Sequence, residues 1–240
     1  MKVIAVTQKG IDKTENEDRI VVGKSILAGG TLFAEIENGV LAVADGVGGR
    51  NAGSVASHFV ADKICFLSDV TMEKLKKINE ELMLLSTENA KQNGMATTLS
   101  GIMLSDDKAL LFSIGNTRVY LLQSGKYLKQ LTVDDTTLSY LLSTGQLTAE
   151  EACKFDRKNE ITACFGGGTT ELFKIKLINI DTNGAPIMIT SDGIHDYLTV
   201  DQMEDIIDEF GLSEKACEEM MTAARDNGSC DDISIVLGDV

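Results

Sequence analysis

Four short acidic segments occur along the chain, and each lies where a predicted β-strand gives way to a turn. In order they are KTENED at 13–18, VADGVGG at 43–49, ITSDGIHD at 189–196 and SCDDISIVL at 229–237. Aspartate is unfavourable in strands and is costly to bury as an unpaired ion. Strand ends that each supply carboxylates therefore need a compensating positive charge, and the hard cations Mg²⁺ and Mn²⁺ prefer such oxygen ligands. The pattern indicates a metal-dependent enzyme.

Length and composition favour one domain that spans residues 1–240. Hydrophobic residues make up 43% of the chain, which is ample for a core, and the sole proline, Pro186, leaves no recognisable linker. The formal net charge of −15 argues against nucleic acid or an anionic membrane as the main partner. A phosphorylated substrate would also meet an unfavourable long-range field, which bound metal ions would have to reverse locally.

Several features favour the cytoplasm over a membrane or an oxidising compartment. No apolar run approaches the roughly 20 residues needed to span a bilayer. The first residues, MKVIAVTQKG, read as a strand and not as a signal peptide. The five cysteines never form a CxxC pair, which is typical of thiols in a reducing compartment. With only two histidines, His58 and His195, zinc hydrolase chemistry is disfavoured.

Hydrophobic periodicity predicts an alternation of strands and helices. The predicted strands are 2–8, 19–25, 31–37, 39–45, 95–104, 108–115, 117–123, 126–131, 172–180, 186–192 and 232–240, and the predicted helices are 52–67, 72–91, 200–210 and 213–227. The Asn38-Gly39 pair favours a hairpin between the strands that flank it. The segments between 95 and 131 read as a β-meander, with Asp106-Asp107 at one of its turns.

The order of these elements predicts the fold class. Strands, a helix pair, strands, a second helix pair and a final strand indicate an α+β architecture, in which antiparallel sheets are covered by pairs of helices. Residues 134–165 are polar and helix-prone, and they lead into the glycine run 166–168. We expect the stretch at about 134–168 to form a flap outside the sheet core. The glycine run could cradle a phosphate through its N–H groups, or it could give a flexible return from the flap to the sheet.

Six motifs along the chain resemble those of the protein phosphatase 2C family, the metal-dependent Ser/Thr protein phosphatases, and in particular its compact bacterial members. They are Asn16-Glu17-Asp18, Ala44-Asp45-Gly46 with Gly48-Gly49, GMATTL at 94–99, GNTRVY at 115–120, Ser191-Asp192-Gly193 and Asp231-Asp232-Ile233-Ser234. Each motif alone is compatible with an ordinary turn or helix cap. Their joint occurrence in the family's order, over nearly the whole chain, carries the resemblance.

The resemblance implies a four-layer αββα fold, a central antiparallel β-sandwich flanked by helix pairs, with two Mn²⁺ or Mg²⁺ ions at one end. The implied metal ligands are Glu17, Asp18, Asp45, Asp192, Asp231 and the Gly46 carbonyl. Asp45 would bridge both ions and act in catalysis with Asp192 and Asp231, which complete the shell of one ion. Glu17 and Asp18 would serve the other ion, directly or through water. A hydroxide between the two ions would attack phosphorus in line, without a phosphoenzyme.

Three positions depart from the family's pattern. Lys13 stands where the family usually carries a phosphate-binding arginine. Lysine keeps the positive charge but lacks the planar guanidinium group that binds phosphate through two hydrogen bonds, so we expect weaker or less directional phosphate binding. Asn116 replaces an aspartate that helps to hold a third metal, so a third ion should bind poorly. Val47 replaces a histidine proposed as general acid in some relatives, which leaves the general acid unassigned. Arg118 is interpreted as a structural ion-pair partner, and His195 as a core or helix-start histidine.

The leading hypothesis is a cytoplasmic, monomeric phosphatase that removes phosphate from phosphoserine and phosphothreonine in proteins and opposes a Ser/Thr kinase. The alternative, which Lys13 and Asn116 motivate, is a nearly inactive relative that binds a phosphoprotein or scaffolds a partner. A sporulation or stress-response phosphatase acting on one small regulator would share the chemistry of the first hypothesis. Motifs do not name the substrate, because specificity lies in the flap and the surface, and oxygen ligands do not separate Mg²⁺ from Mn²⁺.

Overall fold

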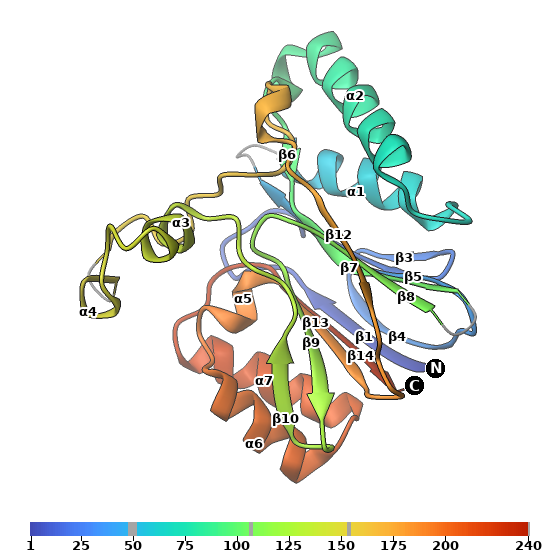
Figure 1. The fold of residues 1–240 in the computed structure, drawn as a ribbon, viewed down its shortest axis with the longest axis vertical. Coiled ribbons are helices and arrows are strands. Elements are labelled where there is room, and N and C mark those ends of the chain that lie inside the picture. Colours follow the sequence, from blue (N-terminus) through green and yellow to red (C-terminus); the bar gives the residue numbers. More distant parts are fainter. Residues whose placement is uncertain (48–51, 106–107, 153–154, 240) are drawn as a thin grey trace.

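A computed structural model of the protein describes residues 1–47, 52–105, 108–152 and 155–239. Two antiparallel sheets pack face to face, and helices cover the outer face of each sheet (Figure 1). Three features of the sequence analysis lie outside the described residues, namely Gly48-Gly49 of the second motif, the predicted turn at Asp106-Asp107, and Cys153.

The first sheet has six strands and the second has eight. The first runs in the order β10 (Tyr127–Gln130), β9 (Arg118–Gln123), β13 (Ile187–Thr190), β14 (Ile233–Asp239), β1 (Lys2–Gln8) and β4 (Gly30–Glu35). The second runs in the order β11 (Phe165–Gly166), β6 (Ala96–Thr97), β5 (Gly39–Val47), β7 (Leu99–Ser105), β8 (Lys108–Ile114) and β12 (Lys176–Ile180). Strand β2 (Asp18–Val22) joins the second sheet by pairing with β5 and with β3 (Ser25–Leu27).

Helices complete the layers on both sides. The second sheet is covered by α1 (Ala52–Cys65) and α2 (Met72–Glu88), which the short turn η1 (Ala90–Gln92) follows. The first sheet is covered by α5 (Asp192–His195), α6 (Val200–Phe210) and α7 (Glu214–Asp226). One apolar core lies between the two sheets. A second lies between the second sheet and its helices, and a third lies between the first sheet and its helices. This arrangement confirms the predicted α+β fold with four αββα layers.

Strand β1 shows how the sequence builds these layers. Its side chains alternate between the two faces of the sheet. Val3 and Ala5 pack in the core between the sheets, whereas Val6 packs in the core beneath α6 and α7. Both faces of the strand are buried, so its apolar residues follow one another without polar interruption.

Two predicted connections are wrong, because the chain changes sheets where the sequence favoured a simple turn. Strand β4 pairs with β1 in the first sheet and β5 pairs with β2 and β7 in the second, so Asn38-Gly39 does not close a hairpin. Similarly, β7–β8 and β9–β10 are hairpins in different sheets and not parts of one meander. Leu32 and Ala34 of β4 pack in the core between the sheets. This long-range packing outweighs the local turn preference.

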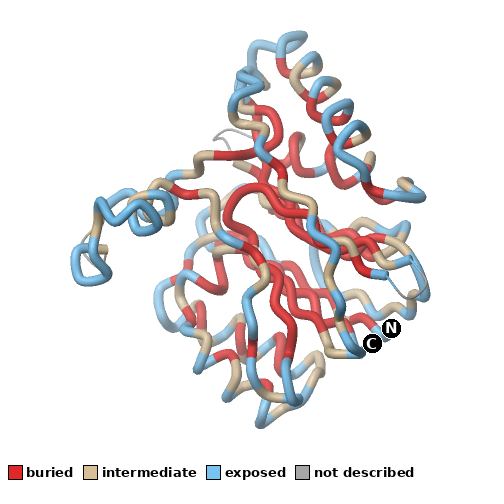
Figure 2. Tube along the Cα trace, viewed as in Figure 1, coloured by how far each residue is buried: buried red, intermediate tan, exposed pale blue. Residues whose placement is uncertain are grey.

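The segment predicted as a flap carries the short helices α3 (Thr137–Ser143) and α4 (Ala149–Ala152), and it projects from the sandwich (Figure 1). Neither of these described helices contains a fully buried residue (Figure 2). A bridge between Thr136 and Ile161 closes the base of the segment, and the turn η2 (Thr170–Leu172) lies on the return to the sheet. Among the described residues, no helix combines the length and apolar character needed to cross a membrane.

Candidate active site

The four acidic segments meet at one end of the sandwich. Asp18 begins β2 and is the register partner of Asp45 on β5. Asp192 begins α5 directly after β13, and Asp231 precedes β14, the neighbour of β13 in the first sheet. Strand β14 also contacts β2 and β5 of the facing sheet. The two pairs of aspartates therefore approach one another from opposite sheets.

Burial and mutual repulsion raise the pKa values of these carboxyl groups. Burial and then the charge of Asp232 raise the pKa of Asp18 to about 7. Burial and then the charge of Asp231 raise the pKa of Asp192 to about 7 as well. The pKa of Asp45 is raised well above its ordinary value by burial and then by Asp192 and Asp18. Acids that oppose one another's ionisation in this way form a favourable place for a cation.

Glu17 and Gly46 are positioned by the close packing of helix α1. The Glu17 carbonyl accepts hydrogen bonds from Ser57 Oγ at 2.5 Å and from the Gly46 N–H at 3.2 Å. A Cβ atom at position 46 would lie 2.3 Å from the Gly53 carbonyl oxygen, so only glycine fits between β5 and α1. Burial raises the pKa of the Glu17 carboxyl, and the nearby charge of Lys13 partly offsets this effect.

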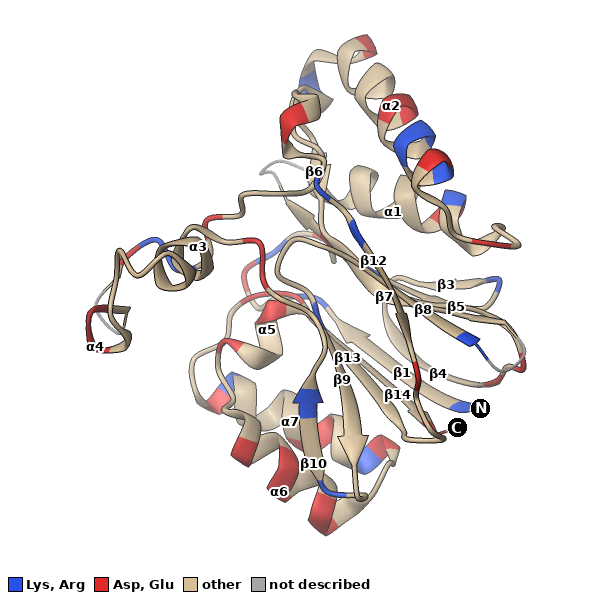
Figure 3. Cartoon of the chain, in the orientation of Figure 1, with Lys and Arg blue, Asp and Glu red and all other residues tan. Residues whose placement is uncertain are grey.

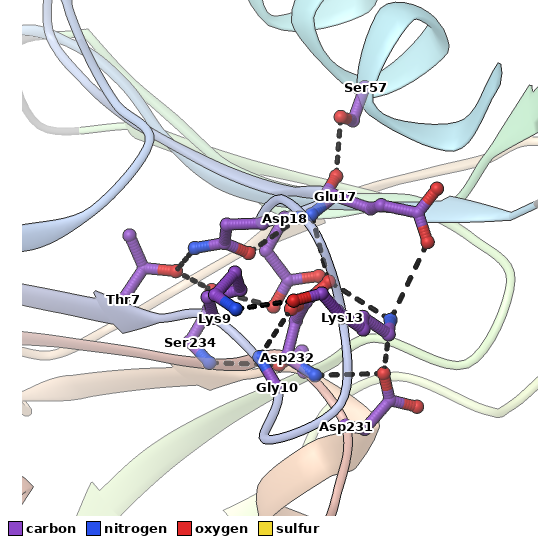
Figure 4. Close-up of polar contacts among 12 residues, drawn as sticks. Thr7, Lys9, Gly10, Lys13, Glu17, Asp18, Ser57, Asp231, Asp232 and Ser234 are labelled. Atoms are coloured by element: carbon purple, nitrogen blue, oxygen red, sulfur yellow. Dashed lines mark hydrogen bonds and ion pairs between the residues drawn. The ribbon is translucent and has the colours of Figure 1, made fainter. Parts of the chain in front are cut away.

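Lys13 lies against the acidic group and contacts three carboxylates (Figure 4). Its Nζ is 2.9 Å from Asp232 Oδ2 and 3.6 Å from Glu17 Oε2, and it also forms an ion pair with Asp231. Burial lowers the pKa of Lys13, but hydrogen bonds to Asp231 and Asp232 outweigh burial and leave the pKa above its ordinary value. The ammonium is thus a fixed positive charge at the edge of the site.

Asp232 is a site residue that the sequence analysis missed. Its side chain is only 1% exposed, whereas that of Asp231 is 44% exposed. Asp232 accepts hydrogen bonds from the N–H groups of Gly10 at 2.7 Å and Glu17 at 2.8 Å, and so ties the loop after β1 to the loop before β14. The adjacent acid pair was the available signal, but the sequence does not say which carboxylate turns inward.

Asn116 lies where the chain crosses from β8 to β9, and so from one sheet to the other. Its side-chain amide donates to Asp192 Oδ2 at 2.9 Å. The residue is buried, and its Oδ1 has no hydrogen-bond partner among the described residues. The amide therefore favours the ionised form of Asp192 and leaves a neutral oxygen available to a ligand.

The donor chemistry of the site fits hard divalent cations. Carboxylate oxygens predominate, and the buried Asp18 Oδ1 has no hydrogen-bond partner in the described part of the chain. Within those same residues, no three His, Cys, Asp or Glu side chains already stand as a complete metal cage. The Lys13 ammonium instead neutralises part of the acidic group. The site supplies suitable ligands, which a cation would have to draw together.

Ion pairs hold the base of the flap. Arg118 Nε lies 3.0 Å from Asp134 Oδ1, and its Nη2 lies 2.6 Å from Asp134 Oδ2, a bidentate arrangement. Lys176 Nζ lies 2.6 Å from Asp135 Oδ1. Burial lowers the pKa of Arg118, but its hydrogen bonds with Asp134 more than reverse this. The predicted role of Arg118 as a structural ion-pair partner is confirmed.

A cavity of about 420 Å³ lies between the flap and the body of the protein. Leu138 and Leu142 of α3 line one side, Tyr197 lines the other, and Asn116 lies in its wall. Asn116 also donates to Asp192, so this residue links the wall of the cavity to the acidic group.

His195 belongs to the core, as predicted from its position. It is buried, and its Nδ1 lies 2.7 Å from Thr190 Oγ1. Burial and then the nearby Arg118 charge lower the pKa of His195 well below its ordinary value. His58 lies on an exposed part of α1.

The glycine run 166–168 uses its N–H groups inside the fold. The Gly166 N–H donates to Asn79 Oδ1 at 2.8 Å, and the Gly167 N–H donates to the Met95 carbonyl at 3.0 Å. All three glycines have positive φ angles between 71° and 78°. Of the two interpretations, the structure favours a return from the flap over a phosphate cradle, because two of the three donors are already engaged.

Comparisons with known proteins establish the family. The sequence model described as Protein phosphatase 2C matches residues 31–227, and the chain belongs to this family. The serine/threonine phosphatase stp of Listeria welshimeri is 30% identical over 251 residues, which cover 96% of this chain and 92% of the relative. The protein phosphatase PhpP of Streptococcus pneumoniae is 30% identical over 258 residues, with 99% and 96% covered.

Solved structures show the same architecture. The serine/threonine phosphatase PstP/Ppp of Mycobacterium tuberculosis superposes with a TM-score of 0.83 at 25% identity, covering 100% of this chain and 99% of that one. Stp1 of Staphylococcus aureus superposes with a TM-score of 0.81 at 25% identity, covering 99% and 94%. Both alignments cover nearly the whole of this chain.

Proposed function

We propose that this chain is a metal-dependent protein phosphatase that hydrolyses phosphoserine and phosphothreonine in proteins. Membership of the protein phosphatase 2C family, and relatives named serine/threonine phosphatases over nearly their whole length, support this function. The observation that carries the proposal is a group of carboxylates from both sheets whose charges repel one another, Asp18, Asp45, Asp192 and Asp231. Such a group calls for cations, and cations promote the hydrolysis of phosphate esters without a protein nucleophile.

Two Mg²⁺ or Mn²⁺ ions are the cofactors that we propose. Their ligands would be Glu17, Asp18, Asp45, the Gly46 carbonyl, Asp192 and Asp231. When bound, such ions polarise phosphoryl oxygens and acidify bound water. Asn116 offers a neutral oxygen where a third ion would favour a carboxylate, so a third ion should bind weakly.

The chain's own groups bind and orient the substrate. Lys13 places its ammonium at the edge of the acidic group, where it can pair with a phosphate dianion. The cavity beside Asn116 provides room for the peptide that carries the phosphate, with Leu138 and Tyr197 as apolar contacts. The Arg118–Asp134 pair fixes the wall of this cavity.

The wider proposal keeps the expectations drawn from the sequence. One domain over residues 1–240, with a flap at about 134–168, would act as a cytoplasmic monomer on proteins phosphorylated by a Ser/Thr kinase. The net charge of −15, with acidic residues spread over α6, α7 and the flap (Figure 3), opposes binding to nucleic acid or anionic membranes.

A metal-titrated assay of phosphate release tests the proposal. Protein treated with EDTA should release phosphate from a phosphothreonine peptide only after Mn²⁺ or Mg²⁺ is added. Asp45→Asn should lower kcat by about 10³-fold or more. Asp208→Asn, at an exposed ion pair on α6, should leave it unchanged. Well-folded protein without turnover at millimolar Mn²⁺ would refute the proposal, and phosphopeptide binding without hydrolysis would support the nearly inactive alternative.

A further inference from the structure

Lys13 has two aspartate partners that differ sharply in their surroundings. Both Asp231 and Asp232 form ion pairs with its ammonium (Figure 4). The Asp232 side chain is 1% exposed, and three donors converge on it, the N–H groups of Gly10 and Glu17 and the Lys13 ammonium. The Asp231 side chain is 44% exposed and, apart from its ion pair with Lys13, accepts a hydrogen bond only from the adjacent Asp232 N–H, at 2.8 Å, among the described residues.

The two ion pairs should therefore respond differently to a competing cation. Removing Lys13 from Asp232 would leave a buried charge with one partner fewer, which is strongly unfavourable. Separating Lys13 from Asp231 would return a half-exposed carboxylate to solvent or to a new partner, and exposed ion pairs contribute little. Asp232 is thus the firm anchor of Lys13, and Asp231 is the partner that can be exchanged.

We propose that Asp232 is the positioning residue that holds Lys13 at the site, and that Lys13 gives up Asp231, but keeps Asp232, when a divalent cation binds. In the metal-free chain the ammonium competes with the cation for Asp231. In the cation-bound chain, Asp232 keeps the ammonium beside the cations. The N–H donor released from Asp231 then faces the phosphate of the substrate. The inference rests on the proposed function and adds to it how the chain prepares its own site.

The first test measures the affinity for Mn²⁺ by calorimetry. Lys13→Gln should tighten Mn²⁺ binding by about tenfold, since it removes the competitor for Asp231. Lys9→Gln is the matched control, because Lys9 lies in the same loop and donates to the Lys13 carbonyl, not to a carboxylate. It should change the affinity by less than about twofold. Equal affinities of Lys13→Gln and wild type, or equal tightening in both variants, would overturn the inference.

The second test asks whether Asp232 acts through Lys13. At saturating Mn²⁺, Asp232→Asn should raise the KM for a phosphothreonine peptide by about tenfold with kcat changed little, because the ammonium loses its anchor. Lys13→Gln should raise KM similarly, and the double variant should show no further increase. Additive effects of the two substitutions, or a loss confined to kcat, would contradict the assignment of Asp232. Lys13→Arg, which keeps the positive charge, should have a KM close to that of wild type, in contrast to Lys13→Gln.

A third measurement uses the wild-type chain and does not depend on the folding of any variant. The side-chain carboxyl ¹³C resonances of Asp231 and Asp232 can be followed by NMR as Mg²⁺ is added. The Asp231 signal should move, and the Asp232 signal should stay in place. Movement of both signals, or of Asp232 alone, would overturn the inference. Failure of wild type to bind Mg²⁺ or Mn²⁺ would instead reject the proposed function, so the two failures are distinguishable.

Discussion

Asp18 and Asp45 face each other as register partners on the adjacent antiparallel strands β2 and β5. Strand pairing fixes this juxtaposition, so neither carboxylate can move far away without disrupting the sheet. Asp18 Oδ2 accepts a hydrogen bond from Ser234 Oγ at 2.7 Å, whereas its Oδ1 has no partner among the described residues. The fold therefore holds two like charges together, and in the absence of cations this lowers its stability.

Replacing Asp18 with asparagine should stabilise the metal-free protein. The substitution removes a buried charge whose pKa is raised to about 7, and the asparagine oxygen can still accept from Ser234. At about pH 8 we expect the free energy of unfolding without metal to rise by roughly 1–3 kcal/mol, while Mn²⁺-dependent activity falls. Urea unfolding in EDTA measures the first effect. An Asp18→Asn variant that is less stable than wild type in EDTA would contradict the proposed repulsion.

Gly46→Ala should displace helix α1 from β5. The added Cβ would lie 2.3 Å from the Gly53 carbonyl oxygen, so the backbone must shift, and we expect a loss of about 2–3 kcal/mol in the free energy of unfolding. Gly29→Ala is the matched control, because its Cβ would meet no atom within 4 Å. Thermal unfolding of both variants measures the difference. Equal stabilities of the two variants would show that the close approach of α1 is not tight.

Arg118→Ala should destabilise the base of the flap. Asp134, whose side chain is 12% exposed, would lose its bidentate partner, and we expect a loss of about 3 kcal/mol. Lys126→Ala breaks the exposed pair with Asp208 and should cost less than about 1 kcal/mol. Denaturant unfolding of the two variants gives the comparison. Similar small losses in both would mean that the Arg118 pair is as weak as a surface pair.

His195 should make the protein sensitive to mild acid. In the unfolded chain this histidine takes up a proton near its ordinary pKa of 6.5, but in the folded protein burial opposes protonation. Below that pH the unfolded state binds more protons, so the contribution of His195 to stability is present above about pH 6.5 and is lost as the pH falls, by up to about 1.4 kcal/mol per unit. The stability difference between wild type and His195→Gln should therefore shrink between about pH 7.5 and pH 5. A pH-independent difference in urea unfolding would refute this.

Asn116→Asp should make the protein bind a further cation more readily. The new carboxylate cannot donate to Asp192 as the amide does, so the metal-free chain should lose about 1–2 kcal/mol of stability. The Mn²⁺ concentration that gives half-maximal activity should fall by about fivefold or more. Unfolding in EDTA and metal-titrated phosphate release measure the two effects. Reduced stability without any change in the metal requirement would argue against a third ion at this position.

Much of the fold followed from the sequence because its signals are local. The periodicity that predicted the helix at 200–210 and the strand at 2–8 reflects which face each element buries, and both elements have those bounds. The Asn38-Gly39 hairpin failed because a turn signal does not specify which sheet the next strand joins. The crossing at Asn116 was missed for the same reason, although this crossing brings the residue to the site.

The acidic site was predicted in composition but not in its internal contacts. Asp18 lies beside Asp45 because β2 pairs with β5 in this register, whereas the motifs implied only that both residues belong to one site. The inward turn of Asp232 depends on backbone donors at Gly10 and Glu17, far away in the sequence. No pattern in the sequence indicates that these N–H groups converge on Asp232. The role of Asp232 as the anchor of Lys13 is therefore seen only in the three-dimensional structure.

The pairing of β1 with β14 joins segments from opposite ends of the described chain and brings together the loops that hold Lys13 and Asp232. Closing so long a loop is among the slower events in folding. A partly folded chain that lacks the β1–β14 pairing would hold only a fraction of the proposed metal ligands. Divalent ions would therefore bind more tightly to chains in which this pairing is complete. They would thereby stabilise mainly the chains in which this pairing has formed, so that metal binding would report completion of the fold.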